Sequence, residues 1–394
     1  MAISTRFDTA RVLATVLLPT LAKGVIVRRP GVMAVAEKVQ SDTRAIDTMR
    51  KLRDRYGPEP VRLRITGRSV AVLVDPTDVG RLLKGSPEPF ALATKEKKAA
   101  LNHFQPHGVL ISEGQERERL RALNERVLRP EHVPVDAIVR DEADLLTRHA
   151  MSTGELTWHS FSQAWWRIVR RIVLGDGARS DDQLTDDLKA LRENANWAFL
   201  RPKQRGLRER FQSRLDEHLA RREEGSLAAQ PGDLAGQAPH WLFAFDAAGI
   251  VTMRALAIGA RGRNGILESA RLWPTTPVIL RESTKPTRWH GTWLPANTEF
   301  VVFTPFFHRD PDRLPYADRY APEIWDGPRD PAIVPFSGGP GVCPGRDLVL
   351  ATGSAMLDAL SEHLSFPKLS TPLPGTLNHF ALRMPATPLG TRVS

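Results

Sequence analysis

The chain has 394 residues, enough to bury a large core, and carries a net charge of +10 with a pI near 10.1. A single cysteine excludes a disulfide framework and fits a reducing cytoplasm, where we expect the protein to be located. No run of 18 or more apolar residues is free of both charge and proline, so we expect no transmembrane span. The positive charge is spread along the chain without a recognition motif, so we expect no nucleic-acid partner.

Secondary-structure patterns begin in the N-terminal quarter of the chain. The apolar stretch from Val12 to Val27 is interrupted by Pro19 and Lys23, and we expect residues 1–41 to form a surface or peripheral segment. We expect residues 42–394 to form a single domain. Apolar spacing and turn residues predict a helix, a two-stranded hairpin and a short capped helix, at residues 42–56, 61–65 with 70–74, and 75–84.

The middle of the chain is predicted to be mostly helical. A loop-rich region covers residues 87–114, a helix opens at Glu116, and residues 135–225 form several amphipathic helices. From His240 to Ala255 the chain is strongly apolar, and Pro239 is placed where a helix can start. Four tryptophans are expected in the core rather than in a site: Trp158, Trp165, Trp166 and Trp197.

The only cysteine lies in a stretch rich in glycine and proline, which is the most informative motif of the sequence. Cys343 is set among four glycines and bracketed by prolines between residues 335 and 346. Apolar residues at helical spacing follow, from Leu348 to Leu360. The amides at the start of that helix, together with its dipole, favour a thiolate over a thiol. A thiolate in such a loop suits a soft metal ion, most obviously haem iron.

Three further interpretations of this stretch are left open by the residues alone. A lone cysteine is often a small buried hydrophobic residue. A glycine-rich loop before a helix can bind phosphate. The cysteine could also be a nucleophile that uses one of the 11 histidines as its base.

The stretch resembles the haem-binding signature of the cytochrome P450 monooxygenases, through Phe336, Gly339, Cys343 and Gly345. The resemblance implies that Cys343 is the axial ligand of haem b, with Phe336 packed beside the sulfur. It also implies a mainly α fold with small β-sheets, in which the haem lies between an oxygen-binding helix and the cysteine loop. Many members have Arg or His two residues before the cysteine. This chain has Gly341, so one usual partner of a haem propionate must be replaced.

The same resemblance implies arginine partners for the haem propionates. Arg117 and Arg121 are four residues apart and share one face of the predicted helix. Arg121 matches the family's arginine, whereas Arg117 replaces an aromatic donor and can still pair with a carboxylate. Arg281, in the extended segment 275–281, is implied as a third partner. Without Cys343, an ordinary charged helix surface would be the simpler interpretation of the first two arginines.

The apolar helix resembles the family's oxygen-binding helix through Ala248, Gly249 and Thr252. The resemblance implies that Gly249 leaves room for dioxygen and that Thr252 donates a hydrogen bond there. The family's usual acid is replaced by Val251, which cannot relay a proton, and Asp246 is expected on a different face of the helix. A glycine in an apolar helix can also be only a packing contact.

A further match is the ion pair implied between Glu268 and Arg271, which is buried in the family. The family's third partner of this pair is replaced by Ile324. Fewer residues separate Thr252 from Glu268 than is usual in the family, so either the intervening helix is short or a segment is absent.

The resemblance implies insertion of one oxygen atom from O2 into an apolar small molecule. Electrons would come from a ferredoxin or flavodoxin, an acidic partner suited to a basic chain. Phe245, Thr276 and Val278 are expected to border the substrate, and we expect a monomer. The region from Phe90 to Phe104 also suggests an apolar substrate.

The replacement of the usual acid by Val251 leaves more than one function open. The main alternative is a peroxide-driven peroxygenase or a redox-independent haem-thiolate enzyme, because neither needs the normal route for protons and electrons. The residues are also compatible with a non-catalytic haem or ligand-binding protein, or with a cysteine hydrolase.

Overall fold

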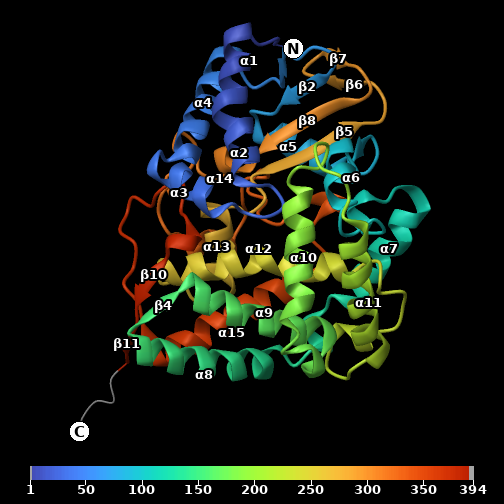
Figure 1. The fold of residues 1–394 in the computed structure, drawn as a ribbon. Coiled ribbons are helices and arrows are strands. Elements are labelled where there is room, and N and C mark those ends of the chain that lie inside the picture. Colours follow the sequence, from blue (N-terminus) through green and yellow to red (C-terminus); the bar gives the residue numbers. More distant parts are fainter. Residues whose placement is uncertain (1, 390–394) are drawn as a thin grey trace. The chain divides into compact units, whose positions relative to one another are not determined.

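The computed structural model describes residues 2–389 and is mainly helical with small β-sheets (Figure 1). The chain divides into two compact units. Unit 1 holds the described residues up to Lys97, together with Ala270–Cys343 and Thr371–Leu377. Unit 2 holds Lys98–Ser269, Pro344–Ser370 and the described residues from Asn378 onward. The prediction of one domain over residues 42–394 stays a prediction.

Unit 1 is built on a five-stranded sheet of order β1-β2-β8-β5-β3. Only the β2–β8 pair is parallel, and β6 and β7 form a separate antiparallel hairpin (Figure 1). The strands are β1 (Val61–Leu63), β2 (Ser69–Val72), β3 (Phe90–Ala91), β5 (Val278–Ser283), β6 (Thr287–Trp289), β7 (Thr292–Leu294) and β8 (Thr298–Phe303).

The predicted hairpin is confirmed as β1 and β2, and its pairing follows from its apolar residues. Val61 is opposite Val72 and Leu63 is opposite Val70, and all four side chains are buried. This register places every apolar side chain of the pair in the core of unit 1.

Helices cover the sheet of unit 1, and two of them confirm predicted ones. The helix predicted at 42–56 is α4, which ends where Gly57 takes a positive φ of 76°. The short capped helix is α5, whose cap Asp75 accepts a hydrogen bond from the Thr77 amide at 2.7 Å. The helices are α1 (Arg6–Val12), α2 (Leu18–Lys23), α3 (Pro30–Lys38), α4 (Ser41–Tyr56), α5 (Pro76–Lys84) and α14 (Thr304–His308).

The first 41 residues contribute both to the surface and to the core. Between α1 and α2 the chain makes a π-helical turn over Leu13–Leu17. Val12 and Val16 are 1% exposed and pack in the core of unit 1, whereas Leu18 and Leu21 are exposed. One apolar face of this segment is therefore buried.

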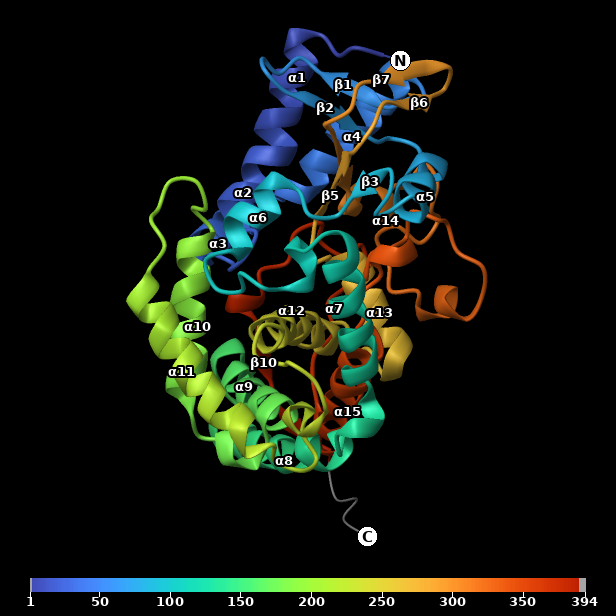
Figure 2. The same ribbon diagram turned by 90° about the vertical axis from the view of Figure 1, so that its right-hand side faces the viewer.

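Unit 2 is a stack of helices with two small two-stranded sheets. In Figure 1, α9 and α15 both lie between α12 and α8, and Figure 2 shows α10 and α11 side by side. The helices are α7 (Gly114–Val127), α8 (Val135–Thr153), α9 (Trp158–Leu174), α10 (Asp182–Ala195), α11 (Arg205–Arg221), α12 (Ala238–Ala257) and α15 (Arg346–His363). The sheets pair β4 (Glu155–Thr157) with β10 (Arg383–Pro385) and β9 (Leu364–Ser365) with β11 (Thr387–Pro388).

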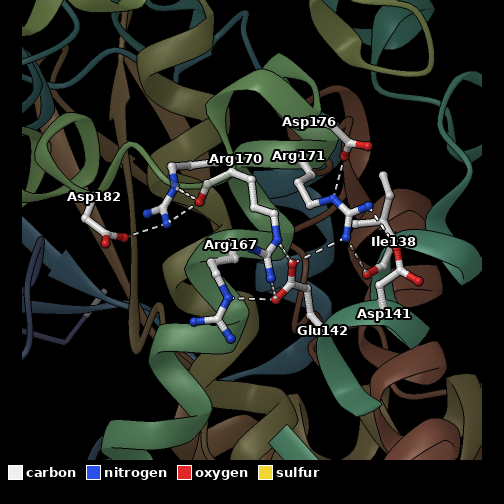
Figure 3. Close-up of polar contacts among 9 residues, drawn as sticks. Ile138, Asp141, Glu142, Arg167, Arg170, Arg171, Asp176 and Asp182 are labelled. Atoms are coloured by element: carbon white, nitrogen blue, oxygen red, sulfur yellow. Dashed lines mark hydrogen bonds and ion pairs between the residues drawn. The ribbon is translucent and has the colours of Figure 1, made fainter. Parts of the chain in front are cut away.

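A buried carboxylate ties α8 and α9 together in unit 2 (Figure 3). Glu142 on α8 is fully buried and accepts hydrogen bonds from three arginines. Arg167 Nε and Arg179 Nε lie 2.6 and 2.5 Å from its two oxygens, and Arg171 Nη1 lies 3.3 Å away. Arg171 also reaches the exposed Asp141 at 3.0 Å. This network holds the two helices at a fixed register.

The helix expected from His240 to Ala255 is α12, which continues after only four residues into α13 (Gly262–Leu272). Gly259 turns the chain there with a φ of 67°. Thr252 on α12 and Glu268 on α13 are therefore only 16 residues apart along this chain. Among residues 2–389 no single helix combines the length and apolar composition of a membrane span. Only the sharply bent pair α12 and α13 passes that test together.

Three details differ from the predictions. The region 87–114 contains a helix, α6 (Lys95–Leu101), because Lys95–Leu101 has no proline or glycine to break it. Phe90, in the region expected to contribute to an apolar pocket, instead packs against Phe300 with the ring centroids 5.5 Å apart, inside the core of unit 1. Trp197 is 40% exposed rather than buried, because it follows the end of α10.

Candidate active site

The loop that carries Cys343 is folded back on itself within unit 1. The Cys343 amide donates to the Phe336 carbonyl at 3.0 Å, and the Val342 amide donates to the Gly339 carbonyl at 3.0 Å. Gly339 has a φ of 58°, and a Cβ there would overlap the Leu83 carbonyl. Glycine at this position is therefore required by both its conformation and its neighbour. The loop leads directly into α15, as the apolar spacing after the cysteine predicted.

A buried histidine holds the start of the same loop. His308 accepts a hydrogen bond from the Val334 amide through Nε2 at 3.0 Å, and its Nδ1 lies 3.3 Å from the Arg271 carbonyl. Burial lowers the pKa of His308 to about 3, and the nearby Arg271 cation contributes to this lowering. A neutral imidazole that accepts through Nε2 and donates through Nδ1 satisfies both contacts. His308 therefore positions the chain that approaches Cys343.

Arg281 lies against the cysteine loop. It is 2% exposed and donates to Ser86 Oγ at 3.0 Å, to the Leu280 carbonyl at 2.9 Å and to Ser337 Oγ at 3.2 Å. A Cβ at Gly341 would lie 2.8 Å from its Nη2 atom. The glycine that replaces the family's usual cation thus leaves the space in which Arg281 lies.

Thr252 on α12 is fully buried and its hydroxyl is engaged within unit 2. It donates to the Ala248 carbonyl at 2.9 Å, one turn earlier on the same helix. A Cβ at Gly353 of α15 would lie 3.0 Å from its Oγ1. The hydroxyl therefore faces α15.

Gly249 makes a packing contact with another helix. This is one of the two roles that the sequence left open, the other being to leave room for dioxygen. A Cβ at this position would lie 2.8 Å from the indole of Trp165 on α9. The Trp165 Nε1 atom donates to the Phe245 carbonyl at 2.7 Å, and the Phe245 ring lies 6.5 Å from the indole. The indole thus occupies the space next to the glycine, and Phe245 has a core environment.

Asp246 is the acid of α12, and sequence reasoning placed it on a different face from Thr252. The structure pairs it with Arg192 of α10, which is 2% exposed. The guanidinium also lies 4.7 Å from the ring centroid of Phe243. Sequence reasoning missed this pair because its two members are 54 residues apart.

Arg117 and Arg121 lie one turn apart on α7, as their spacing predicted. Arg121 pairs with Glu125 at 2.6 Å. Arg117 is 8% exposed, and burial together with the charge of Arg121 lowers its pKa. The charge of Arg121 is therefore paired on α7 itself, and Arg117 lies beside it.

Glu268 and Arg271 on α13 are both fully buried. Arg271 donates to the His308 carbonyl at 2.7 Å and to the Arg319 carbonyl at 2.9 Å. It also donates to the carbonyls of Tyr316 and Ala317. Four backbone carbonyls therefore accept hydrogen bonds from the Arg271 guanidinium. The ion pair between Glu268 and Arg271 stays a prediction.

Two residues predicted to border a substrate lie at the start of β5. Thr276 is exposed and Val278 is half-buried. The Thr276 carbonyl accepts from Thr304 Oγ1 at 3.1 Å, which fixes the chain before the strand.

Comparisons with known proteins agree with this arrangement. Residues 263–371 match the family model for cytochrome P450. The fold matches CYP175A1 from Thermus thermophilus with a TM-score of 0.65, 18% identity and coverage of 90% of this chain and 97% of that one. It matches retinoic acid-bound cyanobacterial CYP120A1 with a TM-score of 0.67, 16% identity and coverage of 87% and 94%. Residues 263–371 thus resemble the cytochrome P450 family, and the described chain has the cytochrome P450 fold.

Curated cytochrome P450 relatives match over shorter stretches. Cytochrome P450 4c21 of Blattella germanica is 31% identical over 106 residues, 26% of this chain and 21% of the relative. The cyclooctat-9-en-7-ol 5-monooxygenase of Streptomyces melanosporofaciens is 29% identical over 119 residues, 29% and 25% of the two chains. The match thus spans about a quarter of the length of these relatives or less.

Cytochrome P450 family members bind protoporphyrin IX haem through a cysteine thiolate, and this chain has residues that fit that group. Its only cysteine lies in a glycine-rich loop, and the buried cation Arg281 lies directly against that loop. Within residues 2–389 no three His, Cys, Asp or Glu side chains gather as a metal site.

Proposed function

We propose that this chain is a haem-thiolate monooxygenase of the cytochrome P450 type that inserts one oxygen atom from O2 into an apolar small molecule. The observation that carries the proposal is the Cys343 loop, whose amide pattern presents one cysteine at the start of a helix. In this proposal Cys343 is the axial ligand, with Phe336, Gly339 and Gly345 shaping the loop around it. The haem would supply oxygen activation, and thiolate donation would favour O–O cleavage.

Further residues have proposed roles toward the cofactor. Arg117, Arg121 and Arg281 would bind its propionates, because each is a buried or partly buried cation. Members of the family receive electrons from a partner protein. We propose a ferredoxin or flavodoxin type, since the net charge of +10 suits an acidic partner.

We propose that Thr252, with Gly249 and Ala248, forms the part of α12 that acts toward dioxygen, as the resemblance to the family's oxygen-binding helix implies. Asp246 is expected on a different face of the helix and is ion-paired with the buried Arg192. Because Val251 replaces the usual acid, a peroxide-driven peroxygenase is the main alternative function.

Absorption spectroscopy of the reduced, carbon monoxide-treated protein tests the proposal. We expect the spectrum of a thiolate-ligated haem from the wild-type protein and from Thr252→Val, which leaves the ligand in place. Cys343→Ser should lose this spectrum, because a hydroxyl is not deprotonated to the same extent. A wild-type protein that takes up no haem, or a Cys343→Ser protein with an unchanged thiolate spectrum, would contradict the proposal.

A further inference from the structure

A second cation lies beside Arg281 in unit 1. Lys97 Nζ donates to the Leu92 carbonyl at 2.7 Å and to the Leu280 carbonyl at 3.3 Å. Arg281 Nη1 donates to the same Leu280 carbonyl at 2.9 Å. Two positive charges therefore share one carbonyl oxygen and lie close together.

The charge of Lys97 is only partly compensated by its surroundings. Both of its described acceptors are neutral carbonyl oxygens, and an ammonium has a third N–H to donate. The adjacent acid Glu96 is ion-paired with Arg68. Burial lowers the pKa of Lys97 well below its ordinary value, and the charge of Arg281 contributes to this lowering. An anion at this point would offset both effects.

The two cations adjoin the backbone of the cysteine loop. A Cβ at Gly341 would lie 2.7 Å from the Leu92 side chain and 2.8 Å from Arg281 Nη2. Leu92 is also the residue whose carbonyl binds Lys97. Lys97 therefore binds Leu92 and shares the Leu280 carbonyl with Arg281. Leu92 and Arg281 both lie against Gly341, two residues before Cys343. A side chain at position 341 would overlap Leu92 and Arg281 where they lie in this structure.

We infer that Lys97, acting beside Arg281, binds a carboxylate of the haem and replaces the cation that many family members carry at position 341. The inference rests on the proposed haem-thiolate function. Iron protoporphyrin IX carries two carboxylates, and a hydrogen bond between an ammonium and a carboxylate is charge-assisted and stronger than a neutral one. Sequence reasoning missed Lys97, because it lies in a run of four lysines and glutamates, Lys95–Lys98, that resembles an ordinary charged helix surface.

The test measures how fast haem leaves the full-length, haem-loaded protein. Wild type, Lys97→Gln, Lys97→Arg and the exposed control Lys95→Gln are loaded with haem, and release is followed by transfer to excess apomyoglobin in a buffer without phosphate or sulfate. The same four proteins are then loaded with haem dimethyl ester, which has no free carboxylate. Far-ultraviolet circular dichroism of each protein verifies that it is folded.

We expect Lys97→Gln to release haem about tenfold faster than wild type, the size expected for one lost charge-assisted hydrogen bond. Lys97→Arg should stay within about threefold of wild type because it keeps the charge. With the dimethyl ester, Lys97→Gln and wild type should release at equal rates. Equal rates with ordinary haem, an equal effect of Lys95→Gln, or a difference that persists with the ester would each overturn the inference. Wild-type protein that takes up no haem would overturn the proposed function and this inference with it.

Discussion

Glu142 offers the sharpest test of how unit 2 is held together, and we predict that Glu142→Gln is strongly destabilising. The carboxylate is fully buried and is bound by Arg167, Arg171 and Arg179 (Figure 3). Glutamine keeps one carbonyl acceptor but removes the negative charge from among three cations. Breaking a buried charge network by removing one partner costs about 3–5 kcal/mol, and we expect ~3 kcal/mol here because one acceptor remains.

Asp141→Asn is the matched control, since Asp141 is the neighbouring residue and bonds the same Arg171. Its side chain is 65% exposed, so its ion pair should contribute less than about 1 kcal/mol. The free energy of unfolding is measured for wild type and both variants by urea titration followed by circular dichroism at pH 7. A cost for Glu142→Gln no larger than that for Asp141→Asn would refute the reasoning.

The pH dependence of the Glu142→Gln effect follows from the pKa of the carboxylate. Burial alone would raise the pKa of Glu142, but the hydrogen bonds from Arg179 and Arg167 outweigh it and leave the pKa lowered. A carboxylate with a lowered pKa in the folded state stabilises the protein fully above its ordinary pKa of 4.5. Its contribution is lost as the pH falls through the lower folded value. The difference between wild type and Glu142→Gln should therefore be constant near neutrality and shrink only below about pH 4.5.

Three further predictions concern the helices around the proposed site. Gly249→Ala should destabilise the protein by about 1–3 kcal/mol in urea titration, because the new methyl group meets the Trp165 indole; an unchanged midpoint would contradict this packing. Thr252→Val should lower product formation about tenfold or more with O2 and an electron donor but not with peroxide, because the proposed role of its hydroxyl is toward dioxygen. An unchanged yield with O2 would contradict that role. Arg271→Lys should lower the free energy of unfolding by about 3 kcal/mol, because one ammonium cannot donate to all four carbonyls that the guanidinium reaches. A loss below about 1 kcal/mol in urea titration would show that these contacts contribute little.

Local sequence patterns were enough to predict much of the fold. The helix α4 with its end at Gly57, the β1–β2 hairpin and the cap at Asp75 follow from periodicity and turn chemistry, which act between near neighbours. The Cys343 loop and the helix after it were predicted for the same reason, since proline restricts φ and glycine permits the positive φ that a tight loop needs. These features depend little on the rest of the chain.

Contacts between distant residues were decided only by the tertiary structure. The sequence left Gly249 open between a role toward dioxygen and a packing contact, and it could not identify the indole beside it because Trp165 is on another helix. It likewise treated Gly341 as a lost cation, whereas the folded chain uses the space for Arg281 and brings Lys97 close by. The physical reason is that spacing along the chain specifies which face a side chain occupies, but burial and charge pairing depend on what packs against that face.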